Sequence, residues 1–479
     1  MQSQKTLCFL CKKVVYFLII TVKIRGHAVK FISLFVCFLT VILLYGGEFR
    51  IAATADLHGD LRRLSCLAPQ IRKANADILL DAGDLTGGNL VAELDGGSSM
   101  IEALNLLKYD FRIPGNHDFE MPQQAFEKQC RDFKGVTLGA DWRWGTASGV
   151  LCKVVKKGSF KVGVIGLTEP DLQRRHLPVA EAPHFREWEK VLREALAVLR
   201  REKVHFTVLL WHNGVESRPN GAAQVLRRLP EIDLIIAAHS HQENAGLRIR
   251  NCYLVQPGAH GTSAALVTIS YDDRSNKVNS VRSSLLRGEK NGAPDLAALA
   301  KRAVKPFYKK IFEKICLKGD LSVRNFPRLG AEALRRAGGT QGAVFVSFTP
   351  EKHAAGADKY KDLFRIISYR NTLCTVTLRK DELKALLTDL HKNNRKFKRV
   401  MGVAGFRWDP GSRKRPSRLE SPPVIRITVS SYIFVSTPVL RSILREKTPR
   451  WQHTDIVERE AVRTYLLTRR STSAVRQGR

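Results

Sequence analysis

Short apolar runs recur along the first two thirds of the chain, and five of them end in polar side chains. Segments with apolar residues at roughly helical spacing separate these runs. Such an alternation predicts strands that are buried on both faces and joined by crossover helices, which is an α/β sheet. The five runs read IAATADLHG, ILLDAGD, FRIPGNHDFE, FTVLLWHNG and LIIAAHSHQ.

The polar residues at the ends of these runs are the candidates for chemistry. Ligands of an open α/β sheet bind beyond the carboxyl ends of its strands, so these side chains are expected to share one edge. Every run ends in Asp, Asn or His, and none of these residues is a Cys. The set is Asp56, His58, Asp84, Asn116, His117, His212, His239 and His241.

Carboxylate and amide oxygens together with imidazole nitrogens suit Mn, Zn, Fe or a related divalent ion. The seven candidate ligands, which are the residues of this set other than His117, are too many for one tetrahedral ion, but they suit two ions that share a bridging carboxylate. Two neighbouring ions can hold a hydroxide between them and stabilise both oxygens of an in-line phosphoryl displacement. The pattern therefore predicts a two-metal phosphoester hydrolase.

Each residue also has an ordinary structural alternative. His212 alone would be a surface histidine at a strand end, and His239 with His241 could be two exposed loop side chains. Asp56 and Asp84 could cap helices, as Asp after a strand often does. These ordinary roles would have to coincide at five strand ends, so we favour the metal site.

In this order the motifs Asp-x-His-Gly, Gly-Asp, Gly-Asn-His-Asp, His-Asn-Gly and His-Ser-His span residues 54–241. The pattern resembles the calcineurin-like metallophosphoesterases, and within them the 5′-nucleotidase/2′,3′-cyclic phosphodiesterase family. Residues 254–269 are similar to the Gly-rich strand pair that closes the family's catalytic domain. The resemblance implies an α/β fold: a four-layer α/β/β/α metallophosphoesterase domain followed by a smaller α+β domain.

The resemblance also implies roles for single residues. His117 is similar to the family's transition-state histidine, and Glu120 stands where the family orients that histidine with an Asp. Asp84 would bridge the two ions. The first ion would be bound by Asp56, His58, Asp84 and His241, and the second by Asp84, Asn116, His212 and His239.

The N-terminal 47 residues are expected to be a signal or membrane-anchor segment. A basic leader precedes an apolar run, residues 31–45, for which we expect a helix. The catalytic domain would then be exported to a periplasmic, extracellular or membrane-anchored location, with cleavage left open. The expected domains are residues 48–285, a linker helix region 286–325 and a C-terminal domain 326–479.

The C-terminal half resembles the family's substrate-recognition domain less closely. FVSFTPEKH supplies no arginine where the family has one, and VSSYIFVSTPVLRSIL lacks the family's second aromatic loop. Tyr369 and Phe406 are candidate aromatic surfaces for a substrate, with core packing as the alternative for each. The expected activity is that of a 5′-nucleotidase-like phosphomonoesterase, and the alternative is a cyclic-nucleotide or other phosphodiesterase.

The charge adds a question about partners. The formal net charge is +34, and residues 391–479 hold 21 Lys+Arg against 6 Asp+Glu, a net of 21 − 6 = +15. Such a surface attracts polyanions or anionic lipid, although a solvated tail is the ordinary alternative. A basic polyanion-binding protein with a vestigial site is therefore the alternative of another class. No zinc finger or helix-turn-helix pattern indicates specific nucleic-acid recognition.

Overall fold

The computed structural model describes the N-terminal strands up to residue 34 by their backbone alone. The described residues are 5–6, 17–24, 27–34, 46–170, 172, 182–215, 221–222, 231–317, 319–322, 324–348, 357–397, 399–411, 417–444, 446 and 450–477.

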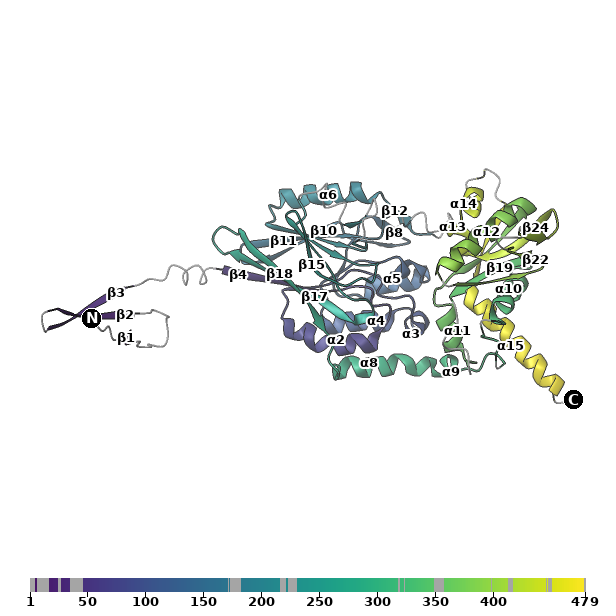
Figure 1. Ribbon diagram of the computed structural model, residues 1–479, viewed down its shortest axis with the longest axis horizontal. Helices are drawn as coiled ribbons and strands as arrows, with labels where there is room; N and C mark the ends of the chain where they lie inside the picture. Colours follow the sequence, from purple (N-terminus) through teal and green to yellow (C-terminus); the bar gives the residue numbers. More distant parts are fainter. Residues whose placement is uncertain are drawn as a thin grey trace.

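Two six-stranded sheets lie face to face in the larger domain (Figure 1). The first has the order β18-β17-β4-β5-β6-β7, and the second has the order β10-β11-β13-β14-β16-β15. The first contains β4 (Gly46–Thr54), β5 (Ile78–Asp81), β6 (Phe111–Arg112), β7 (Val136–Thr137), β17 (Ser263–Asp272) and β18 (Val278–Arg287). The second contains β10 (Cys152–Lys157), β11 (Phe160–Leu167), β13 (Phe206–Trp211), β14 (Leu234–Ala237), β15 (Asn244–Ile249) and β16 (Cys252–Gln256).

The core of this domain lies between the two sheets. Alternate residues of β4, Ile51 and Ala53 among them, face the same apolar cluster as Val164 of β11 and Val208 of β13. Because successive side chains of a strand point to opposite faces, Ala52 packs instead into the cluster beneath the helices. Burial on both faces explains why these strands read as continuous apolar runs.

Helices cover the outer faces of both sheets. On the first sheet these are α2 (Leu61–Ala74), α4 (Ser98–Leu107) and α8 (Pro294–Val304). On the second sheet α6 (Trp188–Arg201) packs through Val191, Leu192 and Leu196. The layer order is α/β/β/α, which confirms the predicted fold class. Shorter elements around this frame are α3 (Leu90–Leu94), η1 (His117–Glu120), α5 (Gln123–Asp132), β8 (Trp142–Trp144), β9 (Ala147–Ser148), β12 (His184–Phe185) and η3 (Ala259–Gly261).

The parallel strands set the position of the candidate residues. β4 pairs with β5 and β5 with β6 in parallel, and in the second sheet β11, β13 and β14 also run parallel. Their carboxyl ends therefore lie at one edge of each sheet, and the two sheets are stacked with these edges together. The polar residues that follow the strands meet at that edge.

The chain then passes through α8, η4 (Lys305–Phe307) and α9 (Tyr308–Ile311) into a smaller C-terminal domain (Figure 1). Its sheet has the order β21-β19-β24-β20-β25 and carries helices on both faces. The strands are β19 (Gly342–Phe348), β20 (Thr372–Arg379), β21 (Arg399–Ala404), β24 (Val424–Ser430) and β25 (Trp451–Val457), beside the small pair β22 (Arg407–Asp409) and β23 (Arg418–Glu420). The helices are α10 (Phe326–Ala337), α11 (Tyr360–Ile366), α12 (Lys380–Phe397), α13 (Ser431–Ser436), α14 (Pro438–Ile443) and α15 (Glu458–Gln477).

The expected N-terminal apolar helix is not confirmed. Strands β1 (Lys5–Thr6), β2 (Phe17–Ile24) and β3 (His27–Leu34) form a small antiparallel sheet, so residues 31–34 end a strand. The rest of the apolar run, residues 35–45, lies outside the described residues, as does the basic run at residues 413–415. Within the described part of the chain no helix is both long and apolar enough to cross a bilayer. The domain boundaries and the signal or anchor segment stay predictions.

Candidate functional site

The backbone is strained at five of the predicted ligands. Asp56, His58, Asp84, His239 and His241 have φ values of 51°, 46°, 53°, 71° and 57°. Non-glycine residues rarely adopt this left-handed region, and such strain collects at functional sites, at a cost on the order of 1–3 kcal/mol per residue. The strand ends therefore turn sharply to direct these side chains to one place.

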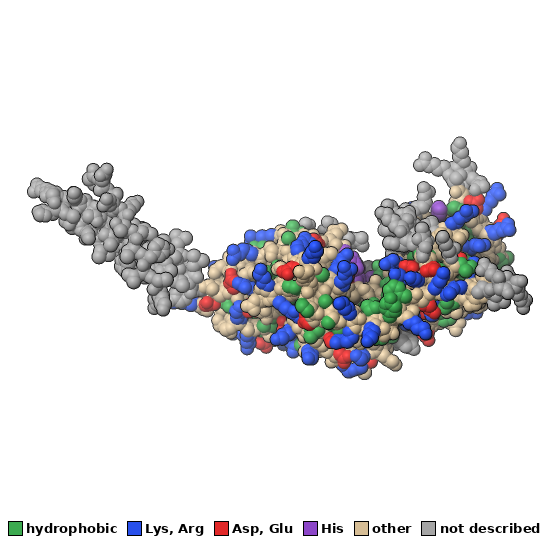
Figure 2. Space-filling model, turned by 90° about the horizontal axis from the view of Figure 1, so that it is seen from below, with side chains coloured by type: hydrophobic (Ala, Val, Ile, Leu, Met, Phe, Trp, Pro, Cys, Tyr) green, Lys and Arg blue, Asp and Glu red, His purple; other side chains and the backbone are tan. Residues whose placement is uncertain are grey.

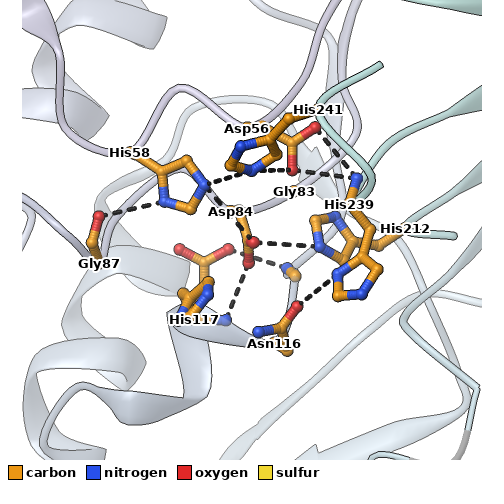
Figure 3. Close-up of polar contacts among 12 residues, drawn as sticks. Asp56, His58, Gly83, Asp84, Gly87, Asn116, His117, His212, His239 and His241 are labelled. Carbon is orange, nitrogen blue, oxygen red and sulfur yellow. Dashed lines mark hydrogen bonds and ion pairs between the residues drawn. The ribbon is translucent and has the colours of Figure 1, made fainter. Parts of the chain in front are cut away.

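Three side chains form the first potential ion-binding group: Asp56, His58 and His241. The Nε2 atoms of His58 and His241 are 3.0 Å apart, and His241 Nε2 lies 3.6 Å from an Asp56 oxygen (Figure 3). The Nδ1 atom of His58 is 3.2 Å from the carbonyl of Gly87, which fixes the ring and leaves Nε2 toward the group. Burial lowers the pKa of His58 to about 3, so its ring is neutral and can bind an ion.

The second group consists of Asp84, His212 and His239, with Asn116 beside it. His212 Nε2 lies 3.2 Å from Asp84 Oδ2, and its Nδ1 is 2.8 Å from the Ala82 carbonyl. His239 Nδ1 is 2.9 Å from the side-chain oxygen of Asn116, as Figure 3 shows. The ligands proposed for the second ion thus face one another from β5, β6, β13 and β14.

Asp84 lies between the two groups, where a bridging carboxylate is expected. Its Oδ2 is 3.8 Å from His58 Nε2 on one side and 3.2 Å from His212 Nε2 on the other. Burial opposes its ionisation, but His212 and His117 hold the pKa of its carboxyl well below the usual range. Asp56, by contrast, has its pKa raised to about 7 by burial. A cation beside these two carboxylates would favour the charged form of both.

The donor set fits divalent ions. The Nε2 atoms of His58 and His241 face each other, and a single proton between them can be bonded to only one of the two. A divalent ion in that space could instead bind the lone pairs of both nitrogens. Although His212 Nε2 is within ion-pair distance of Asp84, it makes no hydrogen bond to any described residue, and it is buried. A buried nitrogen that faces a carboxylate without a well-formed hydrogen bond is expected where a metal belongs.

Two glycines make this close packing possible. A Cβ on Gly115 would lie 2.2 Å from Asp84 Oδ1. A Cβ on Gly83 would lie 2.8 Å from His212 Nδ1, and Gly83 also has a φ of +92°. The Gly in Gly-Asp and the Gly in Gly-Asn-His-Asp therefore let the strand ends approach each other.

His117 and Glu120 make the contact that the resemblance implies. His117 Nδ1 is 2.7 Å from Glu120 Oε1, and its backbone N–H donates to Asp84 Oδ1 over 2.8 Å. Burial opposes the charged ring, but Glu120 and Asp84 raise the pKa of His117 to about 9. Both residues lie within the 3-10 turn η1, three positions apart. From this position the Glu120 side chain reaches the His117 ring, although it is longer than the Asp that the resemblance implies.

The helix-capping roles that were the alternative for Asp56 and Asp84 are filled by other side chains. Asp60 caps α2 by accepting from the Arg63 N–H, and Asn89 caps α3, so neither Asp56 nor Asp84 is a helix cap. Asp118 accepts from the backbone N–H groups of Thr86 and Gly115. It supports the loops rather than facing the ion-binding groups.

Glu169 is a residue that the sequence analysis missed. It follows β11, a sixth parallel strand that ends at the same edge, in the run KVGVIGLTE. Its side chain is buried, with Oε1 3.6 Å from His239 Nε2. The opposite nitrogen of His239, Nδ1, faces Asn116. The sequence does contain the signal that would identify Glu169, because the run KVGVIGLTE also ends in a carboxylate.

The C-terminal domain reaches the site through Tyr369. Its ring is stacked on the ring of His117, with centroids 4.5 Å apart and planes 8° from parallel. Figure 2 shows histidine side chains where the larger domain faces the smaller one. Phe406, the other aromatic candidate, packs at the edge of the C-terminal core near Gly342. Of the two candidate surfaces, Tyr369 is therefore the one at the site.

Comparison with known proteins gives three findings. Residues 49–243 match the family described as calcineurin-like phosphoesterase. A snake venom 5′-nucleotidase of Naja atra is 25% identical over 199 residues, which are 39% of this chain and 36% of that protein. A trifunctional nucleotide phosphoesterase of Bacillus subtilis is 22% identical over 274 residues, covering 47% of this chain and 18% of its own. The match thus spans about a third or less of the length of these relatives.

The fold is also that of solved structures. A 5′-nucleotidase precursor from Thermus thermophilus superposes with a TM-score of 0.65 at 18% identity. The superposition covers 88% of this chain and 96% of that one. It includes the C-terminal domain, which lies beyond the family match at residues 49–243. At this identity the likeness establishes the fold alone.

Proposed function

Because residues 49–243 belong to the calcineurin-like phosphoesterase family, we propose that the chain is a two-metal phosphoester hydrolase acting on a nucleotide-like phosphomonoester. The observation that carries the proposal is Asp84, whose Oδ2 lies between the first and the second ligand group while its Oδ1 accepts from His117 N–H. A carboxylate between the two groups suits two ions that share one ligand, and two such ions can stabilise both the attacking and the leaving oxygen of a phosphoryl displacement.

The ions would be held by the residues that the two groups supply. Bound there, they would activate water and neutralise the negative charge of the phosphoryl group. The first would be bound by Asp56, His58, Asp84 and His241, and the second by Asp84, Asn116, His212 and His239. The ligand set suits Mn, Zn or Fe, and it does not distinguish them.

His117 is proposed as the proton donor to the leaving oxygen. Its raised pKa keeps the ring protonated near neutral pH, so a proton is available at Nε2. Glu120 holds Nδ1 and thereby sets the direction of Nε2. The Asp84 oxygen that accepts the His117 N–H ties this donor to the position of the ions.

A phosphodiesterase is the second candidate. The altered C-terminal half motivates it, since FVSFTPEKH supplies no arginine and VSSYIFVSTPVLRSIL lacks the second aromatic loop of the family that the chain resembles. A polyanion-binding protein with a vestigial site is less favoured, because decay would be expected to remove some of the ligands.

The experiment is a substrate panel on the full chain with added Mn²⁺. It compares 5′-nucleotides, 2′,3′-cyclic nucleotides and bis-(p-nitrophenyl) phosphate, with release of phosphate or nitrophenol as the signal. We expect the 5′-nucleotides to be hydrolysed fastest, and Asp84→Asn to lose both turnover and bound metal. Faster turnover of the diester than of every nucleotide would contradict the phosphomonoesterase, and full activity of Asp84→Asn would contradict the site.

A further inference from the structure

The helical segment that joins the two domains carries many basic residues. α8, η4 and α9 follow one another without a break from residue 294 to residue 311, and they lie along the outside of the molecule (Figure 1). From residue 301 to residue 314 the chain reads KRAVKPFYKKIFEK, with six cations and one acid. None of these residues belongs to the two ligand groups, so the proposed hydrolysis does not account for their charge.

Three of the six cations form ion pairs within the protein. The pairs are Arg302 with Glu102, Lys310 with Glu460, and Lys314 with Asp358. The other three are exposed, and their ammonium groups form no ion pair or hydrogen bond with any described residue. They are Lys301, Lys305 and Lys309. The excess positive charge of the segment is therefore concentrated on these three side chains.

The three unpaired lysines share one side of the helical stretch with an aromatic ring. They are four positions apart, and residues four apart are neighbours on the surface of a helix. Tyr308, three positions after Lys305, is 60% exposed. Its ring lies 4.5 Å from the ring of Phe312, one turn further along. We call this surface, made of Lys301, Lys305, Tyr308, Lys309 and Phe312, the basic stripe.

Two lysines of the C-terminal domain extend the basic stripe. The ammonium group of Lys361 lies 4.7 Å from the centre of the Phe312 ring, and that of Lys359 lies 5.8 Å from it. Cation–π attraction holds both groups beside the aromatic pair. Because α8 packs on the larger domain, the extended surface crosses the joint between the domains. Figure 2 views the side on which α8 and α9 lie, and it shows apolar side chains bordered by Lys and Arg where the domains meet.

The chemistry of the basic stripe fits an anionic lipid surface. Lysine ammonium groups are attracted to negatively charged headgroups, and their methylene stems can lie on apolar surface. Tyrosine is favoured at the boundary between hydrocarbon and water, because its ring is apolar and its hydroxyl is polar. Proteins that bind single-stranded nucleic acid guide its backbone along a charged groove, whereas this stripe lies on the outside of a helix. The position of the stripe therefore favours lipid.

We propose that the basic stripe binds the surface of an anionic phospholipid bilayer and holds both domains against it. The headgroups would neutralise the three ammonium groups that no carboxylate of the described chain neutralises. The two ligand groups contain none of these residues. Membrane binding and hydrolysis can therefore be measured independently of each other.

The test measures binding of the full chain to lipid vesicles by co-sedimentation. One set of vesicles holds about 30% phosphatidylserine in phosphatidylcholine and the other holds phosphatidylcholine alone, both at about 0.1 M NaCl. The readout is the ratio of the two partition coefficients, because the apolar run at residues 31–45 would contribute to both. One lysine near an anionic surface contributes about fivefold. The triple variant Lys301→Gln, Lys305→Gln, Lys309→Gln should therefore lower the ratio about 100-fold.

Tyr308→Ser tests the aromatic part of the basic stripe without a change in charge. It should weaken binding to the anionic vesicles about fivefold, because apolar area is lost from the contact. All the substituted side chains are exposed, so thermal unfolding should match that of the wild type.

The control removes three exposed lysines from the side of the second sheet: Lys153→Gln, Lys156→Gln and Lys190→Gln on β10 and α6. It lowers the net charge by the same amount and should keep the wild-type ratio. A wild-type ratio near one, or an equal loss in the control and in the triple variant, would overturn the proposal. So would tighter binding of single-stranded DNA than of anionic vesicles, if the triple variant loses it, because the stripe would then be a nucleic-acid site.

Discussion

The side chain of Glu120 bears directly on the proposed proton transfer. It is held at 2.7 Å from His117 Nδ1, and its carboxylate is one reason for the raised pKa of that ring. Glu120 touches none of the predicted metal ligands through a hydrogen bond or ion pair among the described contacts. Its effect on catalysis should therefore be separable from metal binding.

We expect Glu120→Gln to lower kcat about 10- to 100-fold, because an amide keeps the size of the side chain but cannot stabilise the protonated ring. Bound metal, measured by mass spectrometry after dialysis, should stay at the wild-type level. Glu120→Asp serves as the matched variant that keeps the charge and shortens the reach. Loss of metal in Glu120→Gln would contradict this separation of roles.

Glu169 is expected to act on the second ion through His239. Carboxylates that face the outer nitrogen of a ligating histidine fix its tautomer and orientation, and their loss typically weakens metal binding about 10- to 100-fold. Glu169→Gln should therefore weaken Mn²⁺ binding at one of two sites, measured by calorimetric titration of the metal-free protein. Glu187→Gln, outside the site, is the control. Two unchanged binding steps would show that Glu169 does not position His239.

The ligands could be predicted from sequence because each follows a short apolar run in the chain. Glu169 obeys the same rule, but its run ends in a single Glu and contains neither a histidine nor a Gly-Asp pair. Tyr369 could not be placed by such reasoning. Its contact with His117 joins two domains that are about 250 positions apart in the chain, and no local pattern encodes that distance.

At the scale of elements, Asp141 anchors the end of β11 just before Glu169. Its Oδ2 accepts from both the N–H and the hydroxyl of Thr168, at 2.9 and 2.7 Å. Burial is the main cause that raises the pKa of Asp141, to about 6, against an ordinary value of 3.8. The folded state thus favours the protonated form of Asp141. The contribution of this group to the free energy of unfolding is therefore fully present below about pH 4, and it is lost as the pH rises to about 6.

Asp141→Asn removes the titrating group and keeps an acceptor for Thr168. The stability of the variant relative to the wild type should therefore increase between pH 4 and pH 7, by roughly 2–3 kcal/mol for a pKa shift of this size. Thermal unfolding of both proteins across this range measures the difference. Parallel curves for variant and wild type would contradict the raised pKa.

Long elements were easier to predict than short ones. Leu61, Leu64, Ala68 and Ile71 recur at helical spacing and lie within α2, and α6 is likewise one of the segments that separate the apolar runs. The five-residue helix α3 has too few turns for a periodic pattern. The role of α3 depends on the surface against which it packs, and that surface belongs to the other domain.

At the scale of the whole molecule, α3 joins the two domains. Leu90 belongs to the larger domain by sequence, yet it packs in the core beneath the C-terminal sheet. Glu93 of the same helix forms an ion pair with Arg459, whose side chain is fully buried. Arg459 also donates to the Ile367 carbonyl over 2.8 Å. The relative position of the domains therefore depends on a buried charge pair.

Arg459→Met should destabilise the protein by about 1.5–3 kcal/mol, because it removes the hydrogen bond to the Ile367 carbonyl and leaves the half-buried Glu93 with only its 3.9 Å contact to Arg370. Thermal unfolding measures this loss. The double variant Arg459→Met with Glu93→Gln should regain part of it, because no uncompensated charge is then left. A double variant as unstable as the sum of the single variants would show that the two residues are not coupled.

The stack of Tyr369 on His117 has a kinetic consequence. One face of the proton donor is covered by a ring from the other domain, so the leaving alcohol and the phosphate can exchange freely only when that ring moves. Each catalytic cycle would then include a mechanical step that parts and rejoins the stack. If this step limits the rate, turnover will fall as the solvent is made more viscous with sucrose, and Tyr369→Ala will be less sensitive to viscosity than the wild type.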